Sequence, residues 1–271
     1  TELARIRGAF RFHPFAPSNG WSEAFETARK NDPAFARFAR NNLRDHKIAG
    51  YAIVGVSLKT PGEIPGDASA DQMDAIADLA EAYGFGEIRV THEQNLVLPH
   101  VRLDDVPTVF AALQTIGLAA PNIDLVSDII ACPGLDYCSL ANARAIPVAQ
   151  DIARRFADPE KAEIIGELKI KISGCINACG HHHIGHVGVL GVDKKGEEFY
   201  QLSLGGSGAE DASLASILGP AVPAAKAAEA VEALVDAYLR ERQDGERFLD
   251  TYRRVGMKPF KEAVYADVAA A

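Results

Sequence analysis

The stretch Leu168-Lys-Ile-Lys-Ile-Ser-Gly-Cys-Ile-Asn-Ala-Cys-Gly180 joins a strand pattern to two closely spaced cysteines. Its first five residues alternate apolar and charged side chains, which is typical of a β-strand. A loop follows at once, in which Gly174 and Gly180 lie on either side of Cys175 and Cys179. Glycines let the backbone approach a bound group closely and point its N–H groups at sulfur. The stretch therefore predicts a strand that ends in a loop bearing two thiolates.

A second cysteine pair lies upstream, in Cys132-Pro-Gly-Leu-Asp-Tyr-Cys138. The two pairs contain all four cysteines of the chain, and 36 residues separate them. Four thiolates brought together suit either zinc or an iron-sulfur cluster. The five-residue gap of the first pair favours the larger [4Fe-4S] cubane, because structural zinc usually takes pairs about two to four residues apart. Two disulfides are a further alternative, which the size of the chain and the lack of a secretory signal disfavour.

The residues next to the cysteines predict how the site is supported. Residues 139–156 are expected to be helical, so that Cys138 opens a helix whose N-terminal dipole stabilises its thiolate. His181-His-His183 and His186 follow Cys179 directly. We interpret these histidines as groups that cap the loop, hydrogen-bond a cofactor's carboxylates or face solvent, since four thiolates already complete a cluster. Direct ligation of zinc or haem by the histidines is the alternative.

Residues 50–118 are predicted to form a ferredoxin-like α+β unit. The expected elements are a strand at 51–58, a helix at 69–83, short strands at 87–92 and 95–99, and a helix at 106–116. Residues 1–49 mix aromatic residues, prolines and charges, and are expected to be an N-terminal arm or linker that packs on another part of the molecule.

Residues 119–271 are predicted to form a larger mixed α/β domain that carries the cysteines. The expected elements are a β-prone run at 123–131, a helix at 139–156, a strand at 168–172, a hairpin of 187–192 with 198–204, and a helix at 224–242. The fold class is therefore α+β, a ferredoxin-like half-domain followed by a larger domain.

Composition and charge exclude several classes of protein. The chain has 271 residues, 48% of them hydrophobic, and a net charge of -9, which argues against binding nucleic acid or an anionic membrane. Its apolar stretches are too short or too interrupted to span a bilayer. The N-terminus lacks both a secretory signal and an initiator Met, as expected of a processed or truncated product. Four clustered thiolates imply a reducing compartment, so we expect the cytoplasm.

The two cysteine motifs resemble a known signature. Ile130-Ala-Cys132-Pro-Gly-Leu-Asp-Tyr-Cys138 and Ile172-Ser-Gly-Cys175-Ile-Asn-Ala-Cys179-Gly are similar to the iron-sulfur and sirohaem-binding signature of nitrite and sulfite reductases. The wider sequence resembles bacterial assimilatory sulfite reductase haemoproteins, from Asp32-Pro-Ala-Phe-Ala-Arg-Phe, through 87–99, to Met257-Lys-Pro-Phe. The resemblance covers almost the whole chain and implies that the larger domain binds a [4Fe-4S] cluster and sirohaem.

The resemblance also implies residue roles. In the family, cysteines that match Cys132, Cys138, Cys175 and Cys179 ligate the cluster, and the one that matches Cys179 also bridges to the sirohaem iron. Asn177 matches a residue near the sirohaem, and Gln94 lies in a strand turn near the cofactors, although both could simply be turn residues. The implied reaction is the six-electron reduction of sulfite to sulfide, or of nitrite to ammonium, with ferredoxin or a flavoprotein as electron donor.

The chain departs from the family pattern in one main respect. Family members consist of two related halves, and this sequence resembles only the second, so that the first half or a second copy is an expected partner. The groups that bind the substrate anion come mainly from the first half, whereas this chain has Glu93, which would repel an anion. Lys169 and Lys171 are candidate catalytic residues, with a solvated strand edge as the alternative. If the missing half is required, the chain is a non-catalytic iron-sulfur or zinc-binding module.

Overall fold

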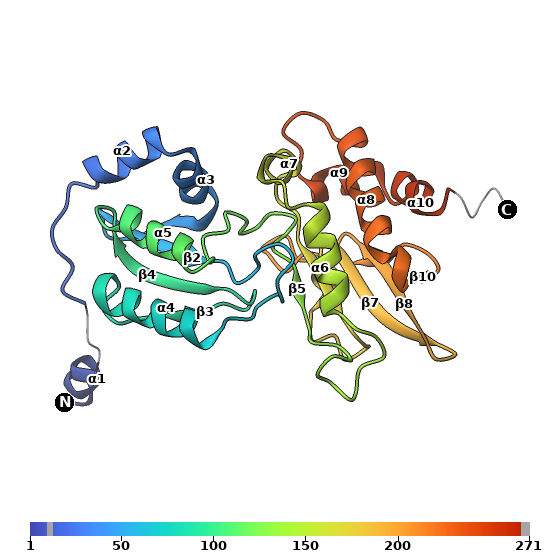
Figure 1. The fold of residues 1–271 in the computed structure, drawn as a ribbon, viewed down its shortest axis with the longest axis horizontal. Helices are drawn as coiled ribbons and strands as arrows, with labels where there is room; N and C mark the ends of the chain where they lie inside the picture. Colours follow the sequence, from blue (N-terminus) through green and yellow to red (C-terminus); the bar gives the residue numbers. More distant parts are fainter. Residues whose placement is uncertain (10–12, 267–271) are drawn as a thin grey trace.

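The computed structural model describes residues 1–9 and 13–266, which form two units side by side along the longest axis of the molecule (Figure 1). The helices are α1 (Glu2–Ala9), α2 (Glu23–Asn31), α3 (Pro33–Asn42), α4 (Ala70–Tyr83), α5 (Val106–Thr115), α6 (Ile146–Arg155), α7 (Pro159–Ile165), η1 (His182–Ile184), η2 (Ala224–Lys226), α8 (Ala227–Glu241), α9 (Phe248–Val255) and α10 (Lys258–Tyr265). The strands are β1 (Leu43–Asp45), β2 (Tyr51–Val56), β3 (Arg89–Val90), β4 (Leu96–Arg102), β5 (Ile130–Ala131), β6 (Ile170–Ser173), β7 (Val187–Lys194), β8 (Glu197–Leu204), β9 (Ser216–Ile217) and β10 (Val222–Pro223).

The N-terminal unit is an antiparallel sheet of order β1-β2-β4-β3 with helices packed on it. Helix α4 begins where the sequence supplies a capping box, in which the Ser69 side chain accepts the N–H of Gln72 and the Gln72 side chain accepts the N–H of Ser69. Helices α3, α4 and α5 share one hydrophobic core with β2 and β4. The ferredoxin-like arrangement of strands and helices predicted between residues 50 and 118 is confirmed.

Part of the segment before residue 50 belongs to this core. Helix α3 starts at Pro33, just after Asp32, whose carboxylate accepts the N–H groups of the first turn. Phe35 and Phe38 from α3 are fully buried against Phe110 of α5. Strand β1 extends the sheet at its edge by pairing with β2.

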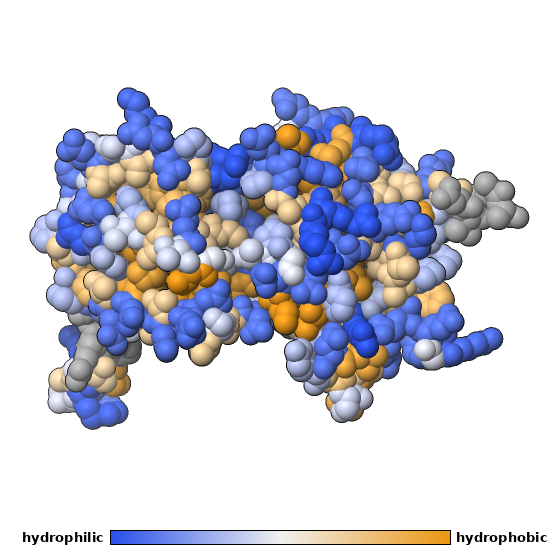
Figure 2. Space-filling view, viewed as in Figure 1, coloured by the Kyte–Doolittle hydropathy of each residue, from blue (hydrophilic) through white to orange (hydrophobic). Residues whose placement is uncertain are grey.

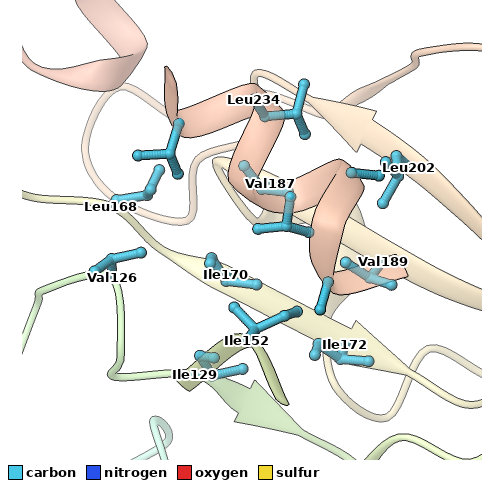
Figure 3. Close-up of a cluster of buried hydrophobic side chains, with 14 of the residues drawn as sticks. Val126, Ile129, Ile152, Leu168, Ile170, Ile172, Val187, Val189, Leu202 and Leu234 are labelled. Carbon is cyan, nitrogen blue, oxygen red and sulfur yellow. The ribbon is translucent and has the colours of Figure 1, made fainter. Parts of the chain in front are cut away.

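The C-terminal unit is a mixed sheet of order β10-β8-β7-β6-β5, with β9 paired to β8. Strands β5, β6 and β7 run parallel, and β7 and β8 form the predicted hairpin. Figure 3 shows the core between the sheet and the helices: Leu234 of α8 and Ile152 of α6 lie near strand residues such as Ile170 and Val189. Helices α6 and α8 thus anchor the strands that lead to the cysteines.

Several predicted elements are shorter than expected, among them the strand at 87–92, of which only β3 forms. The run 123–131 forms a strand only at β5, because Asn122, Leu125 and Asp128 make tight turn hydrogen bonds and Asp124 has a positive φ of 70°. The helix expected at 139–156 is confined to α6. The helix expected at 224–242 divides into η2 and α8 after Pro223.

The two units are joined by polar contacts as well as by the chain. Arg40 of α3 donates to Glu163 of α7 at 2.6 Å, and Gln150 of α6 donates to the carbonyl of Gly62 at 3.1 Å.

None of the helices in the described part of the chain combines the length and the apolar composition that a bilayer crossing needs.

Candidate metal centre

The two cysteine loops meet because β5 and β6 are parallel neighbours. Their register pairs Ala131 with Ile172. The chain continues from these residues into Cys132 on one strand and into Ser173-Gly174-Cys175 on the other. The carboxyl ends of neighbouring parallel strands share one edge of a sheet, which is where α/β sheets usually bind ligands. The fold therefore brings together cysteines that lie far apart in the sequence.

Glycines interlock the two loops. The N–H of Gly174 donates to Sγ of Cys132 at 3.0 Å, as the sequence predicted for a glycine beside the site. The carbonyl of Gly174 accepts the N–H groups of Asn142 and Ala143. A β-carbon on Gly174 would lie 2.6 Å from the carbonyl oxygen of Ala143 and 2.8 Å from Cα of Gly134, so no side chain fits there. The second predicted glycine, Gly180, differs because its N–H donates to the Ser173 hydroxyl at 3.1 Å.

The expectation that Cys138 opens a helix is wrong. Helix α6 begins at Ile146, and Pro147 occupies its first turn, where a fixed φ and a missing N–H are best tolerated. The N–H of Cys138 instead donates to the carbonyl of Gly134 at 2.9 Å and closes a tight turn within the cysteine loop. Cys138 therefore lies outside the field of a helix N-terminus, and the loop geometry alone positions its thiolate.

The four cysteines differ in exposure. Cys132 and Cys175 are buried, Cys138 is half-buried, and Cys179 is exposed. Around them the loops carry apolar side chains that face solvent: Leu135, Tyr137, Leu140 and Ile176. The loop between β5 and α6 projects from the C-terminal unit in Figure 1, and Figure 2 shows apolar surface over the same region. The open side of the site is thus bordered by apolar groups.

The spacing of the sulfur atoms bears on the choice between zinc and a cluster. All four cysteines lie in the described part of the chain, and none forms a disulfide. Four thiolates around one zinc, at Zn–S distances near 2.3 Å, would lie roughly 3.8 Å apart. Among the described residues, no group of three ligand atoms within 4.8 Å of one another contains a cysteine. No three of the sulfur atoms are therefore as close together as the ligands of a single zinc ion.

Two further candidates flank the cysteines. Asn177 is exposed in the loop between Cys175 and Cys179. Gln94 lies in the turn between β3 and β4 with a positive φ of 58°. Its amide is engaged in two hydrogen bonds with the backbone of Ala131, donating to the carbonyl at 2.9 Å and accepting the N–H at 3.1 Å. Gln94 therefore fastens the N-terminal unit to the residue that precedes Cys132.

The two lysines do not form a solvated strand edge. Lys169 Nζ lies 3.1 Å from a Glu93 carboxylate oxygen and also contacts Asp124. Burial opposes the charge of Lys169, but Asp124 and Glu93 outweigh it and raise the pKa of the ammonium. Glu93, expected to repel an anion, is thus neutralised by Lys169. Lys171 is only 5% exposed, forms no ion pair with a described residue, and has a pKa lowered chiefly by burial.

Sequence reasoning missed a buried ion pair beside these lysines. Lys59 Nζ lies 2.7 Å from Asp128 Oδ1, and both side chains are 1% exposed. Asp128 also accepts from Asn95 Nδ2 at 3.0 Å and from the N–H of Asp124 at 2.9 Å. The signal in the sequence is the presence of two acidic residues, Asp124 and Asp128, within the β-prone run 123–131. The pair links the two units four residues before Cys132.

The histidines after Cys179 divide into exposed and buried residues. His181 and His183 are exposed, whereas His182 and His186 are buried. Burial lowers the pKa of both His182 and His186 to about 4. The Nδ1 atom of His186 accepts the N–H of Lys169 at 3.2 Å, which caps the start of β6. None of the four belongs to a close group of metal ligands among the described residues.

Two family models match the chain over most of its length. The model described as "Nitrite and sulphite reductase 4Fe-4S domain" matches residues 123–270, more than half of the chain, and the "Nitrite/Sulfite reductase ferredoxin-like half domain" matches residues 49–116. The chain belongs to the nitrite and sulphite reductase family. This family carries a [4Fe-4S] cluster and sirohaem, and the nitrite and sulphite reductase domain here is the one that contains all four cysteines.

Relatives in the nitrite and sulphite reductase family include enzymes named for either substrate. Ferredoxin--nitrite reductase of Synechococcus elongatus is 30% identical over 180 residues, which cover 64% of this chain and 33% of that protein. Sulfite reductase (ferredoxin) 1 of Mycolicibacterium paratuberculosis is 28% identical over 227 residues, which cover 80% of this chain and 40% of that protein. The chain spans about a third or less of the length of the first relatives it matches.

Solved structures of nitrite and sulphite reductases show the same fold. The Mycobacterium tuberculosis NirA protein superposes with a TM-score of 0.68 at 25% identity, over 81% of this chain and 41% of that one. Dissimilatory sulfite reductase I gives a TM-score of 0.66 at 14% identity, over 80% of this chain and 69% of that one. The predicted α+β fold class is confirmed.

Proposed function

We propose that this chain is the cofactor-bearing half of a sirohaem-dependent reductase that converts sulfite to sulfide with six electrons. The observation that carries the proposal is the pair of interlocked cysteine loops at the ends of β5 and β6, with a backbone N–H donated to Cys132 Sγ. Such hydrogen bonds stabilise a thiolate and tune the potential of a bound cluster. Ligation by Cys132, Cys138, Cys175 and Cys179 is part of this proposal.

The exposure of Cys179 supports its role as the thiolate shared with sirohaem. The other three cysteines are buried or half-buried, so they suit ligands that face only the cluster. Cys179 would hold the cluster and the sirohaem together, and the bound cofactors would supply the chemistry that passes electrons from the donor to the substrate anion. Exposed Asn177 lies beside Cys179 and is proposed to contact the sirohaem.

The remaining polar candidates receive different roles. Gln94 acts as a positioning residue, because its amide both donates to and accepts from the backbone of Ala131, next to Cys132. Lys169 is held by Glu93 and Asp124, which leaves it little capacity to bind an anion. Lys171 has no ion-pair partner among the described residues and is the better candidate for an anionic group, either substrate or a cofactor carboxylate.

The apolar rim of the site supports a partner over the cofactors. Tyr137 and Ile176 are 76% and 79% exposed, and exposed apolar groups clustered at a site usually mark an interface. We propose that the other half of the reductase, or a second copy of this chain, covers them. Ferredoxin is the proposed electron donor, since several relatives are named as ferredoxin-dependent enzymes, with a flavoprotein as the alternative. The thiolates need a reducing compartment, so the cytoplasm is the proposed location.

Nitrite reduction to ammonium is the second candidate. It is favoured by the match to ferredoxin–nitrite reductases from plants and a cyanobacterium, at 28 to 30% identity. Sulfite is placed first because the sulfite reductase match covers 80% of this chain.

The first test is the cofactor content of the chain purified without oxygen. We expect sirohaem absorption bands, with iron slightly in excess of acid-labile sulfide, in the ultraviolet-visible spectrum and metal analysis. Cys179→Ser should lose both the bands and the cluster, whereas Ser139→Ala, an exposed change in the same region, should retain them. Iron equal to sulfide without sirohaem bands would mean a cluster-only module, and zinc without sulfide would refute the proposal.

The second test is the choice of substrate. The loaded chain, alone and after addition of a full-length family member's N-terminal half, is supplied with reduced ferredoxin and either sulfite or nitrite. A higher kcat/KM for sulfite than for nitrite is expected. A higher value for nitrite would select the second candidate, and no turnover in either form would leave a non-catalytic electron-transfer module.

A further inference from the structure

A second group of metal-ligand side chains lies on the N-terminal unit. His13 precedes α2, Glu87 lies between α4 and β3, and His100 is in β4. Each offers one ligand atom, and these atoms all lie within 4.8 Å of one another. The Nε2 atoms of His13 and His100 are 2.9 and 3.4 Å from the same Glu87 oxygen, Oε2. Ligands of a tetrahedral zinc at about 2.0–2.1 Å lie roughly 3.3 Å apart, so little movement is needed.

Hydrogen bonds from neighbouring side chains orient two of these three residues, Glu87 and His100. Arg89 Nε donates to the other Glu87 oxygen, Oε1, at 2.6 Å, and so orients Oε2 toward the histidines. His46 Nε2 lies 2.9 Å from His100 Nδ1 and fixes that ring with its Nε2 toward Glu87. Histidines and carboxylates that bind metals are usually held in this way by hydrogen bonds to their far atoms.

The surroundings also suit an ion. The rings of Phe15 and Phe85 pack against His13, and Phe15 also packs against Tyr51. The side chains of His13, Glu87 and His100 are 31%, 30% and 13% exposed, which leaves an open side for water. Arg89 is the cation that faces the group, and its side chain is 59% exposed and can move into solvent.

The hydrogen bonds of His46 determine how the ring of His100 accommodates an ion. The N–H of Ile48 donates to His46 Nδ1 at 2.9 Å, which places the protons of His46 and His100 on their Nε2 atoms. An ion on His100 Nε2 displaces that ring's proton to Nδ1. The His46 proton then moves to its Nδ1, so that His46 gives up the hydrogen bond from the Ile48 N–H.

A second close group of acidic side chains differs from the histidine group in how its charges are balanced. Glu93, Asp124 and Asp128 also offer ligand atoms within 4.8 Å of one another, but Lys59 and Lys169 already neutralise them. In the histidine group, Arg89 pairs with Oε1 of Glu87 and leaves Oε2 to the two histidines. We propose that His13, Glu87 and His100 bind one divalent ion of the zinc class, with water as a further ligand. The ion fastens the segment before α2 to the sheet.

The test measures zinc on the tag-free chain after its cluster has been loaded, so that the thiolates are occupied. The protein is incubated with zinc chloride and passed over a chelating resin, and zinc is measured by mass spectrometry. About one zinc per chain is expected on the wild type and on His92→Gln, an exposed histidine on the same unit. The double variant H13Q/H100Q should retain at least ten-fold less.

Two further readouts separate this site from other zinc binding. X-ray absorption at the zinc edge should show only nitrogen and oxygen ligands, at about 2.0–2.1 Å. His46→Gln, which removes only a supporting hydrogen bond, should weaken zinc affinity by about 10- to 100-fold. Sulfur in the zinc shell, equal zinc on H13Q/H100Q and wild type, or no zinc retained by the wild type would overturn the proposal.

Discussion

Replacing Lys59 by Met should destabilise the protein more than any exposed lysine change. The substitution keeps the apolar stem and removes the ammonium that pairs with Asp128 at 2.7 Å. Asp128 would remain 1% exposed, with only the donors from Asn95 and the Asp124 backbone. A buried carboxylate that loses its cation is left largely uncompensated.

The expected size of the effect follows from this burial. Removing one partner of a buried ion pair costs about 3–5 kcal/mol of unfolding free energy. Because two hydrogen bonds to Asp128 remain, we expect the lower end, about 3 kcal/mol. At about 2–4 °C per kcal/mol for a chain of this size, the melting temperature should fall by about 6–12 °C.

The assay is urea unfolding of the cluster-free chain, followed by circular dichroism. Lys47→Met is the matched control, because Lys47 is exposed and forms no ion pair with a described residue. A loss below about 1 kcal/mol for Lys59→Met, the range of exposed pairs, would refute the reasoning. A loss of about 3 kcal/mol in Lys47→Met as well would show that the effect does not depend on the buried ion pair.

Three other outcomes are expected. Gly174→Ala should lower cluster retention several-fold, because the new β-carbon would lie 2.6 Å from the carbonyl oxygen of Ala143. Cluster retention is measured as iron content, with Gly8→Ala in α1 as the control. Full retention of iron by Gly174→Ala would contradict this prediction. Gln94→Leu should lower the free energy of unfolding in urea by about 1–3 kcal/mol, because the backbone N–H and carbonyl of Ala131 lose their hydrogen-bond partner. The exposed change Gln114→Leu should have no effect. Equal effects of the two changes would contradict the positioning role of Gln94. His186 has a pKa of about 4 in the folded chain, so it binds a proton more readily when the chain is unfolded. Its contribution to the free energy of unfolding is therefore complete above pH 6.5 and is lost as the pH falls toward 4, by up to about 3 kcal/mol. His186→Gln should remove part of this acid loss in unfolding curves at pH 7 and pH 4.5, His92→Gln should not, and identical pH profiles for wild type and His186→Gln would contradict the assignment.

The sequence was most informative where local pattern and chemistry agree. The strand before Cys175, the hairpin at 187–204 and helix α4 follow from alternation, turn residues and the helical spacing of apolar residues. The site was harder to predict where distant residues interact. Lys169 looked like part of a solvated edge because its partners, Asp124 and Glu93, lie 45 and 76 residues away in the sequence.

Other errors have local causes. The helix expected from residue 139 starts only at Ile146, because Pro147 is favoured in a first turn and the preceding residues are used to bind the Gly174 carbonyl. The burial of Phe35 and Phe38, which places α3 in the core of the N-terminal unit, could not be predicted because the segment before residue 50 is rich in charged residues. The histidine group was missed because His13, Glu87 and His100 share no motif and meet only through the fold.

The parallel pairing of β5 with β6 bears on how the protein matures. The strands are joined by a crossover through α6 and α7, and their register is fixed by backbone hydrogen bonds and a large apolar core. Unlike a zinc finger, which is unfolded without its ion, this scaffold has a core of its own. We therefore expect the two cysteine loops to be in place before the cofactors bind, with Cys179 on the side that is open to solvent.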